Sequence, residues 1–281
     1  MNRAARPRQA DFHTHSTASD GTLAPAALIE ESARRGLRVV ALTDHDTTQG
    51  VQEAVNTGRS LGVRVIAGIE LSAAIERGEL HLLGYGVDPD NEALAMRLAE
   101  LRETRRTRAV KITERLAEIG IDLPRDLVDG MAESESIGRP HIARELMKLG
   151  VVDSVSEGFD RFLGRGKPGF VSRELIHPRE AIQLVRGAGG VAVIAHPYSA
   201  PSFGELIPKL VNAGLSGIEC YYGGYDIERR LELASLASDL GLLATGGSDY
   251  HGPNVREGRD LGAVEIPADA VEALLHAVGH G

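Results

Sequence analysis

Short apolar runs alternate along the chain with segments in which apolar residues recur every three or four positions. The apolar runs are rich in Val, Ile, Leu and Ala, which is typical of buried strands. They lie at residues 10–15, 38–43, 63–69, 191–195, 217–222 and 242–246. The segments APAALIEESARRG (24–36) and DIERRLELASLASDLG (226–241) have the spacing of amphipathic helices. Strands separated by helices predict a parallel sheet with helical crossovers, either closed into a barrel or open.

One long segment interrupts this alternation. The sequence DNEALAMRLAELRETRRTRAVKITERLAEIG (90–120) has the pattern of a single long helix. A second helix is predicted at RPHIARELMKLG (139–150), where Pro140 suits a first helical turn. We therefore expect a helical insertion between two parts of one α/β domain. The predicted parts are a first barrel segment, the insertion and a second barrel segment, at residues 10–87, 88–169 and 170–281.

Histidines and carboxylates follow the strand-like runs. His13 and His15 are two positions apart, so an extended chain presents both imidazoles on the same face. Asp249 and His251 repeat this spacing after the last run, and His45 follows the second run. In α/β proteins of this kind, functional groups gather at the carboxyl ends of the strands. The candidates are His13, His15, Asp20, His45, Glu70, His81, His196, Asp249 and His251.

Taken singly, each of these side chains could be a hydrogen-bonded structural group. Together, six imidazoles and three carboxylates at one edge of a sheet would be costly to bury without cations. Because the set is too large for one ion, the sequence predicts a centre with several metal ions. Mixed imidazole and carboxylate ligands favour Mn²⁺, Fe²⁺ or Zn²⁺ over Mg²⁺. Asp11 and Asp44 are candidates for carboxylates that orient the histidines.

The ordered motifs of the chain resemble those of the PHP (polymerase and histidinol phosphatase) family of amidohydrolase-like metal phosphoesterases. The motifs are DFHTHSTASDG, LTDHD, GIELS, the isolated His81, IAHP and GSDYH, and the resemblance spans residues 10–86 and 170–252. It implies an α/β fold of the PHP type, a distorted (β/α)7 barrel, with a trinuclear centre. Mn²⁺ is the expected ion, and Fe²⁺ or Zn²⁺ are alternatives.

The same resemblance implies which residues hold each ion. One ion would be held by His13, His15, Glu70 and Asp249. Glu70 would bridge to a second ion held by His81 and His196, and the third would be held by Asp20, His45 and His251. His196 and Asp249 are also the expected catalytic residues. Metal ions in this arrangement would activate a water for attack on a phosphate monoester, and a metal-bound water or His196 could protonate the leaving oxygen.

The insertion carries the resemblance that implies a substrate. Its IGRPHIARELM and GKPGF stretches resemble the subgroup that removes the 3′-phosphate from nucleoside 3′,5′-bisphosphates, some members of which also trim RNA from the 5′ end. Arg139, His141 and Lys167 would bind the phosphate that is not cleaved, unless they are solvated surface charges. After IAHP this chain has Tyr198 and Ser199 where relatives commonly have Gly-Arg.

The composition and net charge of the chain argue against some classes of function. The net charge of −9 argues against a general nucleic-acid binder, so the basic run from Arg102 to Arg115 is interpreted as a solvated helix face. Cys220 is the only cysteine, and no apolar run is long enough to span a membrane. We expect a cytoplasmic enzyme that acts on a small phosphorylated nucleotide, or on short RNA, without a membrane or protein partner. A histidinol-phosphate-type phosphatase and a metal-binding module without turnover are the other hypotheses.

Overall fold

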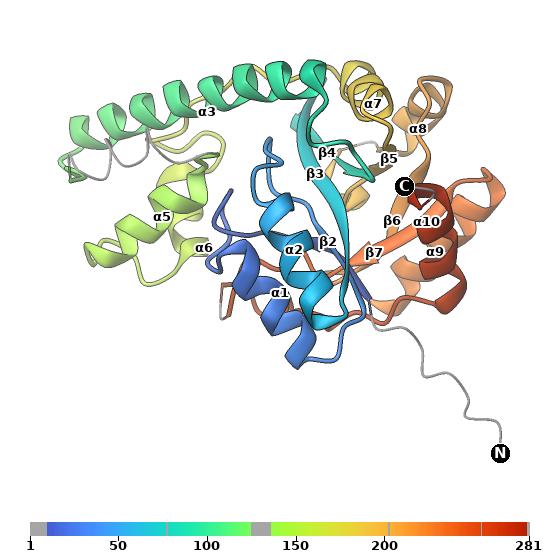
Figure 1. Cartoon of the computed structure of the whole chain (residues 1–281). Coiled ribbons are helices and arrows are strands. Elements are labelled where there is room, and N and C mark those ends of the chain that lie inside the picture. Colours follow the sequence, from blue (N-terminus) through green and yellow to red (C-terminus); the bar gives the residue numbers. More distant parts are fainter. Residues whose placement is uncertain (1–9, 77, 125–135, 202, 254, 280–281) are drawn as a thin grey trace.

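A seven-stranded sheet forms the centre of the computed structural model, which describes residues 10–76, 78–124, 136–201, 203–253 and 255–279 (Figure 1). The strands follow one another in chain order. They are β1 (Ala10–Thr14), β2 (Val39–Leu42), β3 (Arg64–Ile75), β4 (Gly78–Tyr85), β5 (Val191–Ile194), β6 (Gly217–Tyr222) and β7 (Leu243–Gly247). The sheet nearly closes into a barrel, because the backbone N–H of His15 donates to the carbonyl of Tyr250, just beyond β7, at 2.8 Å.

The strand β4 is where the barrel departs from a regular alternation of parallel strands and helices. It pairs antiparallel with both β3 and β5, whereas the other neighbouring strands are parallel. The sequence-based prediction of parallel strands throughout was therefore wrong here, and β3 runs to Ile75 rather than ending near Glu70. Gly78, which opens β4, has a φ of +118°, and the connection from Ile75 to Gly78 is too short for a crossover helix. The predicted distorted barrel of seven strands is confirmed, and β4 is its distortion.

Helices cover the outside of the barrel. They are α1 (Pro25–Arg34), α2 (Val51–Leu61), α7 (Pro178–Gly187), α8 (Phe203–Asn212), α9 (Ile227–Asp239) and α10 (Ala268–Val278). Two apolar clusters lie on opposite faces of the sheet, with Leu82 in one and Leu83 in the other. The first cluster packs under α7 and α9. The second includes Phe12 and Tyr85 and is covered by α10. Within the described ranges, no helix is long and apolar enough to cross a membrane.

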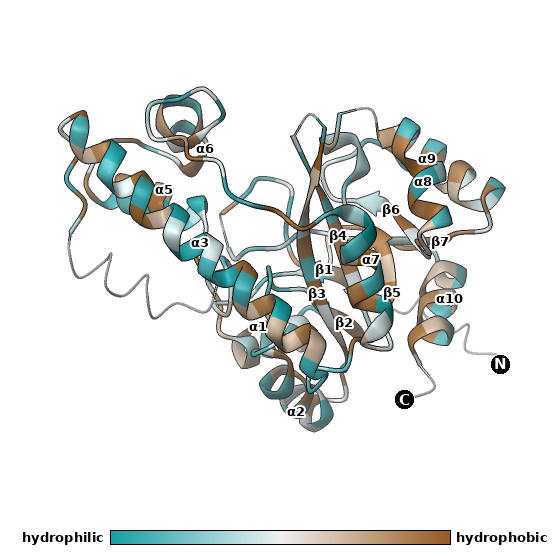
Figure 2. Cartoon of the chain, turned by 90° about the horizontal axis from the view of Figure 1, so that it is seen from above, coloured by the Kyte–Doolittle hydropathy of each residue, from teal (hydrophilic) through white to brown (hydrophobic). Residues whose placement is uncertain are grey.

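The insertion is helical, as the sequence predicts. It contains α3 (Glu92–Glu118), α5 (Arg139–Lys148), α6 (Val155–Gly158) and the π-helical turn η1 (Phe159–Leu163), while residues 125–135 lie outside the described part. The long helix α3 extends away from the barrel towards α5 (Figure 1). Its hydrophobic residues recur along its length between hydrophilic ones (Figure 2).

The two halves of α3 belong to different apolar clusters. Leu94, Leu98 and Leu101 pack in the outer layer of the barrel. Ala109, Ile112 and Leu116 pack instead with residues of α5 and η1 in a separate cluster of the insertion. One continuous helix therefore joins the barrel to the insertion.

Candidate metal centre

All nine predicted ligands converge at the end of the barrel where β1, β2, β5 and β7 finish. They form four overlapping groups in which the potential ligand atoms lie within 4.8 Å of one another. The groups are His15, Asp20, His45 and His251; His13, Glu70 and His196; His13, His15 and Asp249; and His45, Glu70 and His81. His81 lies within β4, and the antiparallel pairing places it opposite Ser72 of β3, two residues from Glu70. The antiparallel strand β4 thus places His81 beside the other candidate ligands.

Glu70 is the centre of this cluster. Its Oε1 lies 2.7 Å from His81 Nδ1 and 3.2 Å from His196 Nε2. Its Oε2 lies 3.2 to 3.3 Å from nitrogens of His13, His15 and His45. Burial would raise the pKa of Glu70, but the surrounding imidazoles hold that pKa well below its usual value. Glu70 is thus a buried, ionised carboxylate with imidazole rings at both of its oxygens. This is the position that a bridge between two ions would require.

Spacings in this cluster fit divalent metal ions. His15 Nε2 lies 3.2 Å from Glu70 Oε2 and 3.4 Å from Asp249 Oδ1, and His13 Nε2 lies 3.3 and 3.5 Å from the same two oxygens. Ligand atoms bound tetrahedrally at ~2.1 Å from an ion lie about 3.4 Å from one another. In addition, His15 Nε2, His45 Nδ1 and His251 Nε2 are buried and make no hydrogen bond of acceptable angle, although carboxylate oxygens lie 3.2 to 3.3 Å away. Such nitrogens are rare in folded proteins, and metal ions would satisfy them.

The candidate histidine ligands differ in protonation before an ion binds. Burial lowers the pKa of His15, but Asp249 and Glu70 outweigh this and raise that pKa to about 9. Burial lowers the pKa of His45 to about 3. His15 therefore carries a proton that an ion must displace, whereas the ring of His45 is already neutral.

Asp249 is held so that one of its oxygens faces the other ligands. Its Oδ2 accepts hydrogen bonds from Tyr222 Oη at 2.9 Å, Arg256 Nη1 at 2.6 Å and Arg259 Nη1 at 2.9 Å. Its Oδ1 lies 3.4 Å from His251 Nδ1. Three donors on one oxygen leave the other for metal ions. Tyr222 and the two arginines carry no pattern in the sequence that distinguishes them, and they were not predicted.

The carboxylates that we expected to orient histidines mainly order loops. Asp44 accepts hydrogen bonds from Ser16 Oγ and Ser19 Oγ, both at 2.6 Å, and so fixes the turn that carries Asp20. Asp11 accepts from Ser248 N at 2.9 Å and Ser248 Oγ at 2.6 Å, and so fixes the residue before Asp249. Both residues place carboxylate ligands through the backbone.

Glu219 is a buried carboxylate outside the predicted ligand set, and it contacts a histidine ring directly. Its Oε1 lies 2.8 Å from His13 Nδ1, and its Oε2 accepts a hydrogen bond from the backbone N–H of His196 at 2.6 Å. Sequence reasoning missed it, although a single acidic residue inside the apolar run GIECYY was a usable signal.

Ser199 and Tyr198 have different surroundings. Ser199 Oγ lies 2.7 Å from His196 Nδ1, so it anchors the ring of this ligand. Tyr198 Oη donates to Glu232 of α9 at 2.6 Å. Ser199 thus supports His196, and Tyr198 is held against the outer helix α9.

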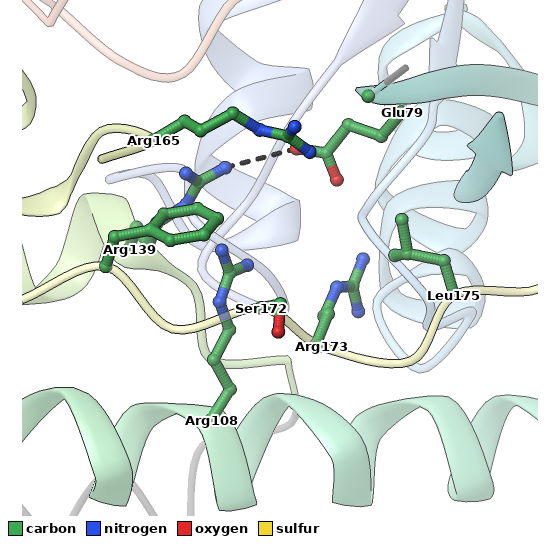
Figure 3. Close-up of a pocket in the computed structure, with 9 residues that line it drawn as sticks. Glu79, Arg108, Arg139, Arg165, Ser172, Arg173 and Leu175 are labelled. Carbon is green, nitrogen blue, oxygen red and sulfur yellow. Dashed lines mark hydrogen bonds and ion pairs between the residues drawn. The ribbon is translucent and has the colours of Figure 1, made fainter. Parts of the chain in front are cut away.

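Two adjoining cavities lie beside the ligands. The first has a volume of about 170 Å³ and is lined by Asp20, His45, His81 and several arginines, including Arg105 and Arg256. The second has a volume of about 150 Å³ and is lined by four arginines, Arg108, Arg139, Arg165 and Arg173, together with Glu79 (Figure 3). We call this second cavity the arginine hollow. The two cavities share four lining residues, Glu79, Arg108, Arg139 and Arg173.

Positive charge is crowded in the arginine hollow. Burial, together with Arg139 and Arg173, lowers the pKa of Arg108 to about 9. Burial and the neighbouring Arg105 lower the pKa of Arg173 to about 10. Glu79 is the only carboxylate among the described lining residues of the hollow. Cations held this close together bind an anion favourably, because it relieves their mutual repulsion.

The three residues predicted to bind the substrate phosphate have different positions. Arg139 lines both cavities. His141 Nδ1 accepts a hydrogen bond from the backbone N–H of Gly138 at 3.1 Å, at the start of α5. Lys167 is exposed, close in sequence to the lining residue Arg165.

The interpretation of the basic run on α3 as a solvated face was wrong for two of its residues. Arg105 is buried, and its Nε lies 2.5 Å from Asp46 Oδ2. Arg173, which lies outside the run, also contacts that oxygen through its Nη1, at 3.2 Å. The second residue of the run is Arg108, which lines the arginine hollow. The acidic Asp46 of the LTDHD motif therefore holds arginines at the cavity rather than a histidine.

Comparisons with known proteins identify the family of the chain. The PHP domain model matches residues 11–173. The chain is 37% identical over 263 residues to a 3′,5′-nucleoside bisphosphate phosphatase from Chromobacterium violaceum, with 91% of each chain covered. It is 35% identical to a 5′-3′ exoribonuclease from Haemophilus influenzae, over 86% of this chain and 90% of the relative. A crystal structure of an amidohydrolase from Chromobacterium violaceum with bound sulfate superposes with a TM-score of 0.87 at 34% identity, covering 96% of both chains.

Proposed function

Because this chain belongs to the PHP domain family of metal-dependent phosphoesterases, we propose that it removes the 3′-phosphate from nucleoside 3′,5′-bisphosphates and leaves a nucleoside 5′-monophosphate. The observation that carries the proposal is the pair of adjoining cavities. One is bordered by metal-competent residues and the other by four arginines. A substrate with two phosphates could place one in each cavity.

The metal centre of this proposal contains three divalent ions, with Mn²⁺ as the expected ion and Fe²⁺ or Zn²⁺ as alternatives. The residues that would hold them are His13, His15, Asp20, His45, Glu70, His81, His196, Asp249 and His251. Bound there, the ions would lower the pKa of a water towards neutrality and neutralise the oxygens of the phosphate. His196 and Asp249 are the proposed catalytic residues, because both present ligand atoms to this centre.

Arg256 would bind the phosphate that reacts. It lines the cavity beside the ligands, and its side chain is 44% exposed. Tyr222 and Arg259 also donate to Asp249 Oδ2, so Arg256 can turn to the substrate without leaving that oxygen unpaired. A guanidinium group in this position would neutralise phosphoryl oxygens and hold the phosphorus for attack.

Arg139 and its neighbours in the arginine hollow would bind the phosphate that does not react. Contacts to a remote group orient the reacting one, so their binding energy contributes to turnover as well as to affinity. Histidinol phosphate and nucleoside monophosphates have a single phosphate. They would leave either the metal centre or the arginines without an anion.

A second candidate function uses the same two cavities. RNA with a 5′-phosphate presents a terminal phosphate and a neighbouring phosphodiester, which could bind the arginine hollow and the metal centre respectively. The similarity to the exoribonuclease from Haemophilus influenzae favours this candidate over other phosphatases.

A comparison of substrates tests both candidates. We expect kcat/KM for adenosine 3′,5′-bisphosphate to exceed the values for AMP, histidinol phosphate and a short 5′-phosphorylated RNA. A higher value for the RNA would establish the exoribonuclease instead. A higher value for histidinol phosphate would overturn both, because that substrate has no group for the arginine hollow.

A further inference from the structure

Glu219 joins two residues of the metal centre that come from different strands. It lies in β6, is fully buried, and is the only acidic residue of that strand. Its neighbours Ile218 and Cys220 point to the opposite face, into the apolar layer beneath α7 and α9. Each of its oxygens has its own partner, His13 for Oε1 and His196 for Oε2. Burying a carboxylate costs free energy, and the contacts with His13 and His196 offset that cost.

The contact with His13 fixes which nitrogen of the ring can bind metal. Oε1 of Glu219 lies at hydrogen-bond distance from Nδ1 of His13, so Nε2 is the ring nitrogen that remains for a metal ion. That atom is the one that faces Glu70 Oε2 at 3.3 Å and Asp249 Oδ1 at 3.5 Å. Carboxylates that bind the distal nitrogen of a ligand histidine set its orientation and raise its basicity.

The contact with His196 stabilises a strained backbone. His196 has a φ of +29° and a ψ of +60°, in the left-handed region that residues other than glycine rarely adopt. The pairing of β5 with β6 ends at Ile194 and Ile218, so Glu219 is the next residue of β6 to face the point where the chain turns. Its Oε2 accepts the His196 N–H that the ladder no longer satisfies. The ring is then directed so that Nε2 lies 3.2 Å from Glu70 Oε1.

We propose that Glu219 is a positioning residue that orients His13 and His196 together, and so couples the ligands of two neighbouring ions. Both rings approach Glu70, at opposite oxygens, and they stack with their centroids 5.8 Å apart. Loss of Glu219 frees both ligands at once. This inference rests on the metal centre of the proposed function and is independent of the substrate.

The test measures metal binding rather than turnover. Glutamine keeps the shape of Glu219 but cannot accept both hydrogen bonds with oxygen, so Glu219→Gln should weaken the affinity for Zn²⁺ or Mn²⁺ about 10- to 100-fold. Affinity is measured by competition with a chelator, and the bound ions are counted by elemental analysis. Cys220→Ala is the matched control, because Cys220 is equally buried on the same strand and faces away from the ligands. We expect its affinity and ion count to match those of the wild type.

A double-mutant cycle separates positioning from a general loss of stability. In a His13→Ala background, Glu219→Gln should weaken metal binding by a smaller factor than in the wild type, because one of its two contacts is with His13. Equal factors in the two backgrounds, or wild-type affinity in the Glu219→Gln protein, would overturn the inference. If the wild type itself bound no metal, the proposed function would fail instead.

A second measurement needs no variant of Glu219. In Zn²⁺-loaded protein labelled with ¹⁵N-histidine, His13 should show a proton on Nδ1 with the strong downfield shift of a hydrogen bond to a carboxylate. The signal is assigned by its loss in His13→Gln. A His13 ring that carries its proton on Nε2 would overturn the inference, whether or not the Glu219 variants fold.

Discussion

In the arginine hollow, Oε1 of Glu79 accepts a hydrogen bond from Nη2 of Arg139 at 3.1 Å (Figure 3). Glu79 is also the carboxylate nearest to where a second substrate phosphate would bind, so the protein supplies its own counter-ion for the hollow. Burial raises the pKa of Glu79, but His81 and Arg139 keep that pKa below its usual value. The carboxylate is therefore ionised in the neutral range and competes with an anionic substrate.

Replacing Glu79 should change affinity and stability in opposite directions. Glu79→Gln removes the competing charge, so KM for adenosine 3′,5′-bisphosphate should fall severalfold. The melting temperature without substrate should fall as well, because the arginines then repel one another without a counter-ion. Steady-state kinetics and thermal unfolding measure the two effects. A higher KM would show that Glu79 assists binding.

Truncating an arginine of the hollow should affect a bisphosphate more than a simple ester. A charge-assisted hydrogen bond contributes about 1.5–3 kcal/mol, so Arg139→Ala or Arg108→Ala should raise KM for the bisphosphate by roughly 10- to 100-fold. KM for an aryl phosphate should change little, because that substrate has no second phosphate.

Arg106→Ala is the matched control for these variants. Arg106 lies on the same helix as Arg108, and its contact is with Glu103 at 3.6 Å. Arg106→Ala should leave KM unchanged for both the bisphosphate and the aryl phosphate. Lys167→Ala, measured alongside, decides whether this exposed residue joins the site. Equal effects of Arg139→Ala on both substrates would assign Arg139 to the scaffold.

Removal of metal should abolish activity. After treatment with a chelator, the phosphatase activity should disappear and return with Mn²⁺, and gently purified protein should contain more than one equivalent of metal per chain. Asp249→Asn and His13→Ala should lower kcat by orders of magnitude, because the ions supply the nucleophile and the charge stabilisation. Full activity with a single firmly bound ion would contradict the trinuclear assignment.

Metal binding should depend on pH in a direction set by His15. In the metal-free protein, burial lowers the pKa of His15 but Asp249 and Glu70 raise it overall, from 6.5 to about 9. A raised pKa stabilises the metal-free fold fully below pH 6.5, and this contribution is lost as the pH rises through about 9. The melting temperature of the metal-free protein should therefore fall over this range.

Affinity for metal should rise over the same pH range, because the ion must displace the proton from His15. Calorimetry at neutral pH, in buffers with different ionisation enthalpies, should detect protons released on binding. If no protons were released, His15 would have to be neutral before the ion arrives. Chelator competition at several pH values provides an independent check.

Most of the candidate ligands could be picked out because they have a local signature in the sequence. The two-apart spacing of His13 and His15, and the polar side chains directly after apolar runs, are visible without a structure. The PHP family motifs then place these residues in one barrel. The strand β4 was missed because its apolar run follows β3 after a single turn, whereas the other strands are separated by helices.

The residues that surround the candidate ligands could not be predicted from the sequence. Arg105 and Arg108 are three positions apart on α3, a spacing that an exposed helix face and a cavity wall share. Which of the two occurs depends on how α3 lies on the barrel. Glu219 is a single carboxylate in an apolar strand, and its partners are 206 and 23 residues away in sequence. The isolated acidic residue is visible in the run GIECYY, but long-range contacts of this kind leave no local pattern that identifies its partners.

The continuous helix α3 means that the insertion and the barrel cannot be exchanged by cutting the chain at the start of the insertion. Cutting the chain at residue 88 would remove Leu94, Leu98 and Leu101 from the apolar layer of the barrel. It would also remove Arg105, the buried partner of Asp46. A chimaera that exchanges substrate preference between relatives should therefore be spliced within α3, after Arg105, so that the barrel keeps Leu94, Leu98, Leu101 and Arg105 and the insertion keeps the half of the helix that begins at Ala109.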